Sequence, residues 1–363
     1  MSGARWVWRL AGVGAALMLA ACSTTADGRD ATSPPAASVP ATTTTAASPS
    51  GSPTDAGSLP PGLDASDPYV QLAAELHRRG VQVWFETDLV KRWLEGPDAF
   101  AQAVKRVGAL ARLPGVEGLK IADELGYGDG LDSPEQARQF LTDTEAAVHR
   151  LAPSTSLLVD VIVPELGCLP WRGPDQQACA ESARADYPAA TEEAMTSYLR
   201  TGAIDVLDLS TGLLEDSTYR DWGLTLAEAQ QDAWAHVAGS DWPGLTILQA
   251  RKALAEPGGY QGSDAQAIAD VGLYVDIPLA AGASAVDIWT WRQPYEGATV
   301  SLLPPDLTPN PLWRQLRDRK AAGAQLLTHM TPSLMPTSEA GFGRECDTAA
   351  EVFSGVFVAA GTG

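Results

Sequence analysis

The chain has 363 residues and a formal net charge of −20 at pH 7. Residues 1–60 contain three basic and three acidic residues, so the whole acidic excess belongs to the residues that follow. Such an acidic surface repels phosphate backbones and excludes nucleic acid as a favoured partner. The simplest role of the charge is to keep the protein soluble.

The first predicted element is the short apolar run Ala11–Ala21, which follows Arg5 and Arg9. It is too short for a permanent membrane-spanning helix but has the length of a signal-peptide core. The run ends in Leu19-Ala20-Ala21-Cys22, which resembles the bacterial lipoprotein signal. The resemblance implies cleavage before Cys22, a lipid on its sulfur, and a location on the extracytoplasmic face of the cell membrane.

The next predicted segment is a tether. Residues 23–60 are Ser, Thr, Ala, Pro and Gly almost throughout, with no aromatic residue. They cannot bury enough surface to offset the entropy of ordering, so we expect a flexible spacer. We therefore predict a signal peptide (1–21), a lipidated cysteine with a disordered tether (22–60) and one folded domain (61–363). The lipid is the only membrane contact that the sequence predicts.

From residue 68 onwards, helical patterns alternate with short apolar runs. The predicted strands are Val81–Leu89, Gly118–Glu124, Leu157–Val163, Ile204–Ser210, Leu245–Arg251 and Ala285–Trp291. The predicted helices between them are Pro97–Leu113, Ser133–Leu151, Ala189–Thr201, Thr225–Val237 and Ser263–Ala280. This alternation predicts an α/β domain with a parallel sheet covered by helices.

The length of the folded part favours a (β/α) barrel of the TIM type with parallel strands. The strands recognised above are too few for a closed eight-stranded barrel, so an incomplete or irregular barrel and an open doubly wound sheet both remain as alternatives. One missing strand is predicted in Val352–Ala359 or near Thr331–Pro336, because the first of these segments is apolar and β-branched.

Two cysteines of the folded part lie close in sequence. Cys168 and Cys179 flank a loop-like Leu-Pro-Trp-Arg-Gly-Pro stretch. Because an exported domain meets an oxidising compartment, we predict that they form a disulfide. Cys346 has no predicted partner.

Each predicted strand carries polar or tryptophan residues on one of its two alternating faces. In a barrel this face would line the lumen, and active sites lie where the strands end. The candidate catalytic residues are Glu124, Glu165 and Asp160. The candidate substrate-binding residues are Trp84, Glu86, Asp123, Asp208, Gln249, Arg251, Trp289 and Trp291.

Carboxylates beside tryptophans suit a carbohydrate, since indole faces stack on pyranose rings and two carboxyl groups can serve as acid and base or nucleophile. The chain resembles (β/α)-barrel glycoside hydrolases in two motifs. Ile121-Ala122-Asp123-Glu124 stands where that family has Asn-Glu, and Asp287-Ile288-Trp289-Thr290-Trp291 resembles its last strand. The resemblance implies a glycoside hydrolase with Glu124 as general acid. The second carboxyl group would come from another strand of this chain, with Glu165 or Asp160 preferred and Glu86 as a further candidate.

The sequence departs from this family at the penultimate strand, because Thr246–Arg251 lacks the expected nucleophilic glutamate. A non-catalytic glycan-binding or solute-binding lipoprotein therefore remains an alternative. No cofactor is predicted.

Metal sites have little basis in the sequence. The four histidines, interpreted as surface or helix-packing residues, lack the spacing of a zinc site. They are His77, His149, His236 and His329. No metal is therefore predicted, with calcium at Asp129 and Asp132 as a weaker alternative.

Overall fold

The computed structural model describes residues 59–242, 246–249 and 254–359. The predicted signal peptide, Cys22 and the tether up to residue 58 lie outside these residues. None of the helices in this part of the chain combines the length and the apolar character that crossing a membrane requires.

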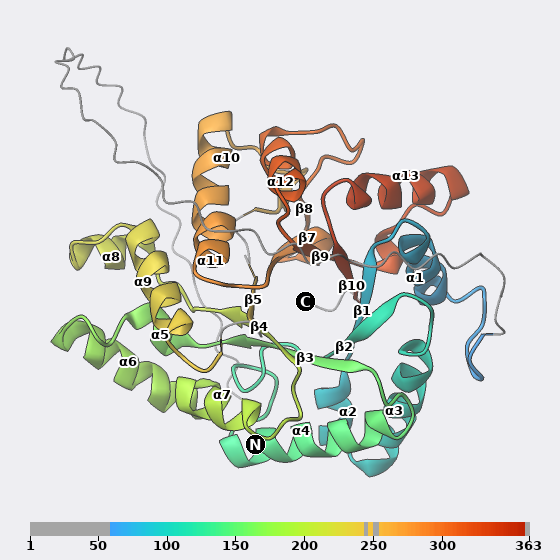
Figure 1. Cartoon of the computed structure of the whole chain (residues 1–363), viewed down its shortest axis with the longest axis horizontal. Helices are drawn as coiled ribbons and strands as arrows, with labels where there is room; N and C mark the ends of the chain where they lie inside the picture. The colour runs from blue at the N-terminus through green and yellow to red at the C-terminus, as the bar shows by residue number, and fades with distance from the viewer. Residues whose placement is uncertain (1–58, 243–245, 250–253, 360–363) are drawn as a thin grey trace, which may run out of the picture. The chain divides into compact units, whose positions relative to one another are not determined.

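Eight parallel strands within the described residues pair in a closed ring, so the domain is a TIM-type α/β barrel. The strands occupy the middle of Figure 1 and the helices surround them. In order around the ring they are β1 (Gln82–Glu86), β2 (Val116–Ala122), β3 (Ser156–Ile162), β4 (Val206–Ser210), β5 (Thr246–Gln249), β7 (Ala285–Tyr295), β9 (Leu326–Met330) and β10 (Gly355–Val358).

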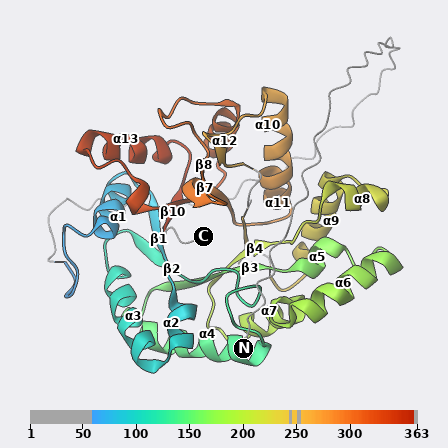
Figure 2. The ribbon, with the colours of Figure 1, turned by 180° about the vertical axis from the view of Figure 1, so that it is seen from behind.

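The barrel helices lie between or after the strands along the chain, except the first, which precedes every strand. They are α1 (Pro68–Arg78), α2 (Leu89–Glu95), α3 (Pro97–Leu110), α4 (Pro134–His149), α5 (Pro164–Cys168), α6 (Pro174–Asp186), α7 (Glu192–Leu199), α8 (Asp216–Asp221), α9 (Leu226–Ala238), α10 (Asp264–Val271), α11 (Ile277–Ala280), α12 (Pro311–Ala321) and α13 (Glu339–Ala350). Seen from behind, the same ring of helices encloses the strands (Figure 2).

Local sequence explains several helix starts. Ser133 and Ser263 cap α4 and α10 by accepting hydrogen bonds from backbone N–H groups, and Thr225 forms a capping box with Glu228 at the start of α9. Each such cap satisfies an otherwise unpaired donor, which contributes about 1 kcal/mol. The predicted helix Ser263–Ala280 is α10 and α11 joined by a π-helical turn, η2 (Gly272–Asp276).

Two parts of the apolar core position the site. The larger part fills the space between the strands and the surrounding helices. The smaller part lies inside the barrel and consists of Trp84, Leu158, Ile247, Ala285, Leu327 and Phe357, with Val206 packed against them. Burial of each large apolar side chain contributes about 1.5–3 kcal/mol. We call this inner cluster the lumen floor.

The prediction of a parallel barrel is confirmed, and the alternatives of an open doubly wound sheet and an incomplete barrel are wrong. Val352–Ala359 contains β10, as predicted. The segment Thr331–Pro336 is not a strand. Strand β9 ends just before it, at Met330, and the segment contains a short 3-10 helix, η3 (Pro332–Leu334).

Two short strands, β6 (Glu256–Pro257) and β8 (Ala298–Ser301), pair antiparallel next to the extended end of β7. They lie outside the closed ring of parallel strands. Cys168 of α5 and Cys179 of α6 form a disulfide, whereas Cys346 is a free, buried thiol in α13.

Candidate functional site

A set of charged side chains lies directly above the lumen floor. All but Lys120 follow a floor residue by two positions on the same strand, so they point into the lumen one step nearer the carboxyl end of the strand. Lys120 stands two positions after Gly118, which adds no side chain to the floor. We call the set the lumen ring. Its members are Glu86 of β1, Lys120 of β2, Asp160 of β3, Asp208 of β4, Asp287 of β7 and His329 of β9.

Lys120 is fully buried in this ring. Its Nζ lies 3.0 Å from Oδ1 of Asp123, 3.2 Å from Oδ2 of Asp160 and 3.7 Å from Oε2 of Glu86. Burial alone would lower the pKa of Lys120, but the charges of Asp123, Glu86 and Asp160 raise it well above its usual range. The side chain is therefore an ammonium group and not a nucleophilic amine.

His329 bridges two carboxylates of the ring. Its Nδ1 lies 2.7 Å from Oε2 of Glu86, and its Nε2 lies 2.7 Å from Oδ2 of Asp287. Burial alone would lower the pKa of His329, but Asp287 and Glu86 raise it to about 9. The imidazolium form donates from both nitrogens.

The same contacts act on the two carboxylates beside His329. Burial alone would raise the pKa of Glu86, but Lys120 and His329 bring it below its ordinary value. The pKa of Asp287 is also lowered, because the charge and hydrogen bond of His329 outweigh the effect of burial. Both groups are therefore ionised.

Asp208 and Asp160 differ from these two carboxylates. They stand directly opposite each other on β4 and β3, and both are fully buried. Burial, followed by the charges of Asp287 and Asp160, raises the pKa of Asp208 well above its usual range. Burial also raises the pKa of Asp160, despite the opposing charge of Lys120. The ring therefore combines carboxyl groups that favour a proton with carboxylates that do not.

Hydrogen bonding agrees with a protonated Asp208. As a carboxylate, neither of its oxygens would meet a donor among the described residues. As an acid it donates to Asp287, which in turn helps to keep the pKa of Asp287 low. Asp160 shares a hydrogen bond with Asp123 in the same way. Asp208 and Asp160 thus each donate a hydrogen bond to a neighbouring carboxylate, Asp287 in the ring and Asp123 at the rim.

The rim of the site is formed by the residues that follow β2. Asp123 contacts Lys120 and its side chain is 39% exposed, whereas Glu86 below it is 13% exposed. Glu124 is half-buried and has a left-handed backbone with φ of 56°, which few residues other than glycine adopt. Leu125 then donates its N–H to the carbonyl of Asp160 at 2.8 Å, so this loop crosses the end of β3.

The third candidate catalytic residue, Glu165, does not contact the ring in the structure. It is buried in α5, where it accepts hydrogen bonds from the side chain of Arg184 and, at 2.5 Å, from the backbone N–H of Glu192. Glu165 therefore stabilises the packing of the segment between β3 and α7.

The predicted tryptophans do not line a cleft. Trp84 belongs to the lumen floor, and Trp289 packs edge-on against Tyr295. Trp291 points outwards, donates to Glu345 at 2.6 Å and packs against Trp313. The three predicted indoles are 2% to 6% exposed, which leaves no face for a sugar ring.

Of the two remaining predicted binding residues, the structure describes only Gln249, on β5. The Cα of Gln249 pairs with that of Asp287, so Gln249 stands beside the ring on its strand. Arg251 lies outside the described residues.

Sequence reasoning missed His329. The interpretation of all four histidines as surface or helix-packing residues is wrong for this one, which is 2% exposed on a strand. The missed signal is the segment Leu-Leu-Thr-His-Met, since a barrel strand buried on both faces reads as a short apolar run.

Among residues 59–242, 246–249 and 254–359, no three or more His, Cys, Asp or Glu side chains are arranged to hold a metal ion. Asp129, considered above for calcium, accepts hydrogen bonds from the N–H groups of Gly126 and Leu131 within its own loop. It therefore shapes the turn of this loop.

No known family model matches the chain, and no curated protein matches its sequence. Among solved structures, the carboxyl transferase domain of Rhizobium etli pyruvate carboxylase with 3-bromopyruvate is 12% identical, with a TM-score of 0.40. That match covers 80% of this chain and 42% of that chain. A protein named as a phosphonomutase, from Burkholderia cenocepacia, is 15% identical with a TM-score of 0.36, and the match covers 80% and 92% of the two chains.

The expectation that the domain is a glycoside hydrolase, with its alternative of a non-catalytic glycan-binding or solute-binding domain, is wrong. The geometry gives the physical reason, because Trp291 faces the outer helices while Asp160 faces the lumen. The predicted roles of Glu124, Glu165 and Asp160 in sugar cleavage are therefore wrong as well.

Proposed function

We propose that the domain is an enzyme of the general acid–base class, acting on a small molecule at the carboxyl end of the barrel. The observation that carries the proposal is the lumen ring, in which acids that favour a proton adjoin ionised carboxylates. Groups whose pKa values are driven apart in this way are suited to donating and accepting protons near neutral pH.

Asp123 is the member of this network placed to meet a substrate, because it reaches the rim while its neighbours are buried. Its hydrogen bond with Asp160 provides the proton supply. Asp123 takes up the proton of Asp160 and passes it to the substrate. Both groups are then carboxylates, and Lys120, which contacts both, stabilises the added negative charge. Lys120 remains an ammonium group throughout.

The charge of the protein restricts the substrate. At a net charge of −20, long-range repulsion disfavours polyanions such as nucleic acids and acidic polysaccharides. Uncharged small molecules avoid this repulsion. The proposed substrate class is therefore a neutral polar small molecule with an atom that gains or loses a proton during the reaction.

The test is turnover of a panel of neutral esters, amides, lactones and hydroxy ketones, followed by mass spectrometry between pH 5 and 9. Asp123→Asn and Asp160→Asn are compared with Asp318→Asn, a change at an exposed position on α12. Loss of a general acid or base typically costs about 10²- to 10⁴-fold in rate. We expect that loss in Asp123→Asn and Asp160→Asn and none in Asp318→Asn. Full turnover in both of the first two variants would contradict the proposal.

We also propose that the protein is exported and anchored by lipid on Cys22. The sequence Leu19-Ala20-Ala21-Cys22 supports this location, and so does the Cys168–Cys179 disulfide, since structural disulfides form in oxidising compartments. Mass spectrometry of the membrane fraction should find a processed amino terminus carrying acyl chains on Cys22. Cys22→Ser should release the protein, and an unchanged membrane fraction in that variant would refute the anchor.

A further inference from the structure

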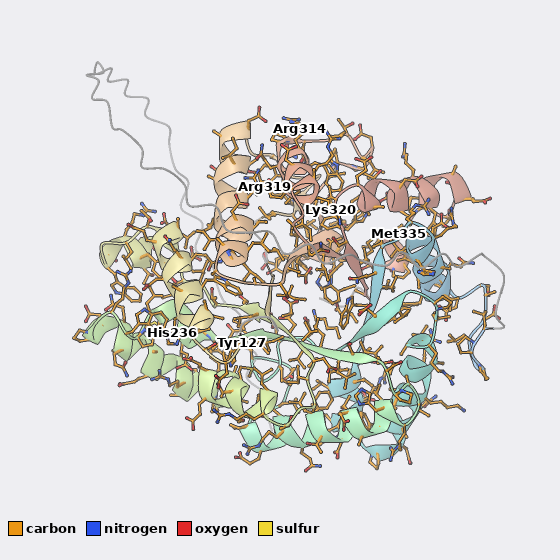
Figure 3. The ribbon with its side chains drawn as sticks, in the orientation of Figure 1. Tyr127, His236, Arg314, Arg319, Lys320 and Met335 are labelled. Carbon is orange, nitrogen blue, oxygen red and sulfur yellow. A yellow bond between two sulfur atoms is a disulfide. The ribbon has the colours of Figure 1, made fainter. Side chains whose placement is uncertain are left out.

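The segment between β3 and α7 packs against the loop that carries the rim of the site. This segment, residues 163–191, comprises α5, α6 and the short 3-10 helix η1 (Pro188–Ala190). We call it the β3 insert, and we call residues 123–133 the β2 loop. Figure 3 places Tyr127 of the β2 loop on the side of the barrel where α5, α6 and α7 lie.

Two contacts join the β2 loop to the β3 insert. The rings of Tyr127 and Tyr187 stack with centroids 4.3 Å apart. Gly126 packs so closely that a Cβ there would lie 2.5 Å from the carbonyl oxygen of Ala189. Its φ of +73° also favours glycine. The end of the β3 insert is therefore the surface against which the β2 loop is shaped.

The buried carboxylate of Glu165 holds the end of the β3 insert in position. Glu165 is 3% exposed and belongs to α5, yet it holds Arg184 of α6 and the first N–H of α7, that of Glu192. A carboxylate at the amino end of a helix is stabilised by the unpaired N–H groups and the helix dipole. Because η1 directly precedes α7, fixing the start of α7 also fixes Ala189.

We infer that Glu165 is a positioning residue, which holds the β3 insert so that the β2 loop presents Asp123 and Glu124 at the rim. The chain of contacts runs from Glu165 through η1 to Gly126, three residues after Asp123. The effect on catalysis rests on the proposed function, whereas the mechanical coupling does not.

The Cys168–Cys179 disulfide is a second brace on the same segment. It ties α5 to α6 across 11 positions of sequence, with the two Cα atoms 5.6 Å apart. Arg184, the partner of Glu165, lies on the same α6 helix as Cys179. The ion pair and the disulfide therefore join the same two helices, and loss of either one leaves the other.

The test is amide hydrogen exchange of the purified protein with Glu165→Ala, and Glu193→Ala as the matched control. Glu193 is also a carboxylate near the start of α7, but it is exposed. The probes are the N–H groups of Leu125 and Tyr127, each bonded at 2.8 Å in the native loop. We expect about tenfold faster exchange of residues 124–130 in Glu165→Ala, the scale of one lost charge-assisted hydrogen bond. β9 and the control protein should exchange at the native rate.

A second readout reports on the site itself. Carbon-13 NMR of labelled aspartate should find the titration of Asp160 displaced in Glu165→Ala, because its partner Asp123 has moved, and unchanged in Glu193→Ala. Glu165→Gln keeps an acceptor for Glu192 and should restore slow exchange in part; it also replaces the alanine variant if that protein does not fold.

Native exchange in residues 124–130 of a folded Glu165 variant would overturn the inference. Equal acceleration in every strand would do so too, since it indicates a general loss of stability. Because neither readout uses a substrate, absence of turnover in the panel above would affect only the proposed function.

Discussion

His329 should make the stability of the protein fall as the pH rises through the weakly alkaline range. The imidazolium is buried between Glu86 and Asp287, with both contacts at 2.7 Å. These carboxylates raise the pKa of His329 to about 9 from an ordinary value of 6.5. A histidine with a raised pKa in the folded state stabilises fully below pH 6.5 and loses this contribution as the pH rises through about 9.

The difference between these two pKa values corresponds to about 3 kcal/mol of unfolding free energy. Urea unfolding followed by tryptophan fluorescence at several pH values between 6 and 9.5 measures it directly. The free energy of the native protein should fall by about this amount across the range. His329→Gln should be less stable at pH 6 and should lack this fall of about 3 kcal/mol, because the amide does not titrate.

Other groups that titrate in this range, such as the Cys346 thiol after unfolding, are common to both proteins and cancel in the difference between the two curves. A His77→Gln variant, changed at an exposed position on α1, should follow the native curve. Parallel curves for the native protein and His329→Gln would refute the bridging imidazolium.

Three further substitutions test the interior. Lys120→Met should lower the unfolding free energy at pH 7 by about 3–5 kcal/mol, because it leaves buried carboxylates without their cationic partner. In urea unfolding this loss of stability should be smaller at pH 5, where the carboxylates take up protons. An equal loss at both pH values would contradict the role of the ammonium group. Gly118→Ala should lower the unfolding free energy measured by calorimetry by about 1–3 kcal/mol or more. The reason is that its Cβ would lie 2.4 Å from the indole ring of Trp84 and 2.3 Å from the carbonyl oxygen of Ser156. Gly128→Ala is the control, because a Cβ there meets no atom closer than 3.9 Å. Trp291→Phe removes the indole donor from buried Glu345 and should cost about 1–3 kcal/mol in urea unfolding; native stability would mean that this hydrogen bond contributes nothing.

The barrel could be predicted because the alternation of helices and apolar strands follows from patterns within short sequence segments. The parity of the strands also brought Glu86, Asp160 and Asp208 together, since a period of two places every second side chain on one face. Parity failed at β7, where the register with β9 shifts between Ile288 and Arg292. Trp291 therefore turns outwards although Asp287, four positions earlier, faces the lumen.

The remaining errors come from contacts between segments far apart in the chain. Glu165 follows a strand directly, as a catalytic residue often does, but its partners Arg184 and Glu192 belong to an insert whose packing has no local signature. His329 was hidden for a different reason. Its charge is set by Asp287 and Glu86, which lie 42 and 243 positions away, and no local sequence window contains all three.

The lumen floor gives the barrel a closed end. Trp84, Phe357 and their neighbours pack beneath Lys120 as a continuous apolar layer, and the ring of Phe357 lies 5.7 Å from the ammonium nitrogen. Asp123, by contrast, is 39% exposed and contacts Lys120 from the opposite side. A ligand that covers Asp123 would therefore shield Lys120 and the carboxyl groups around it from bulk solvent.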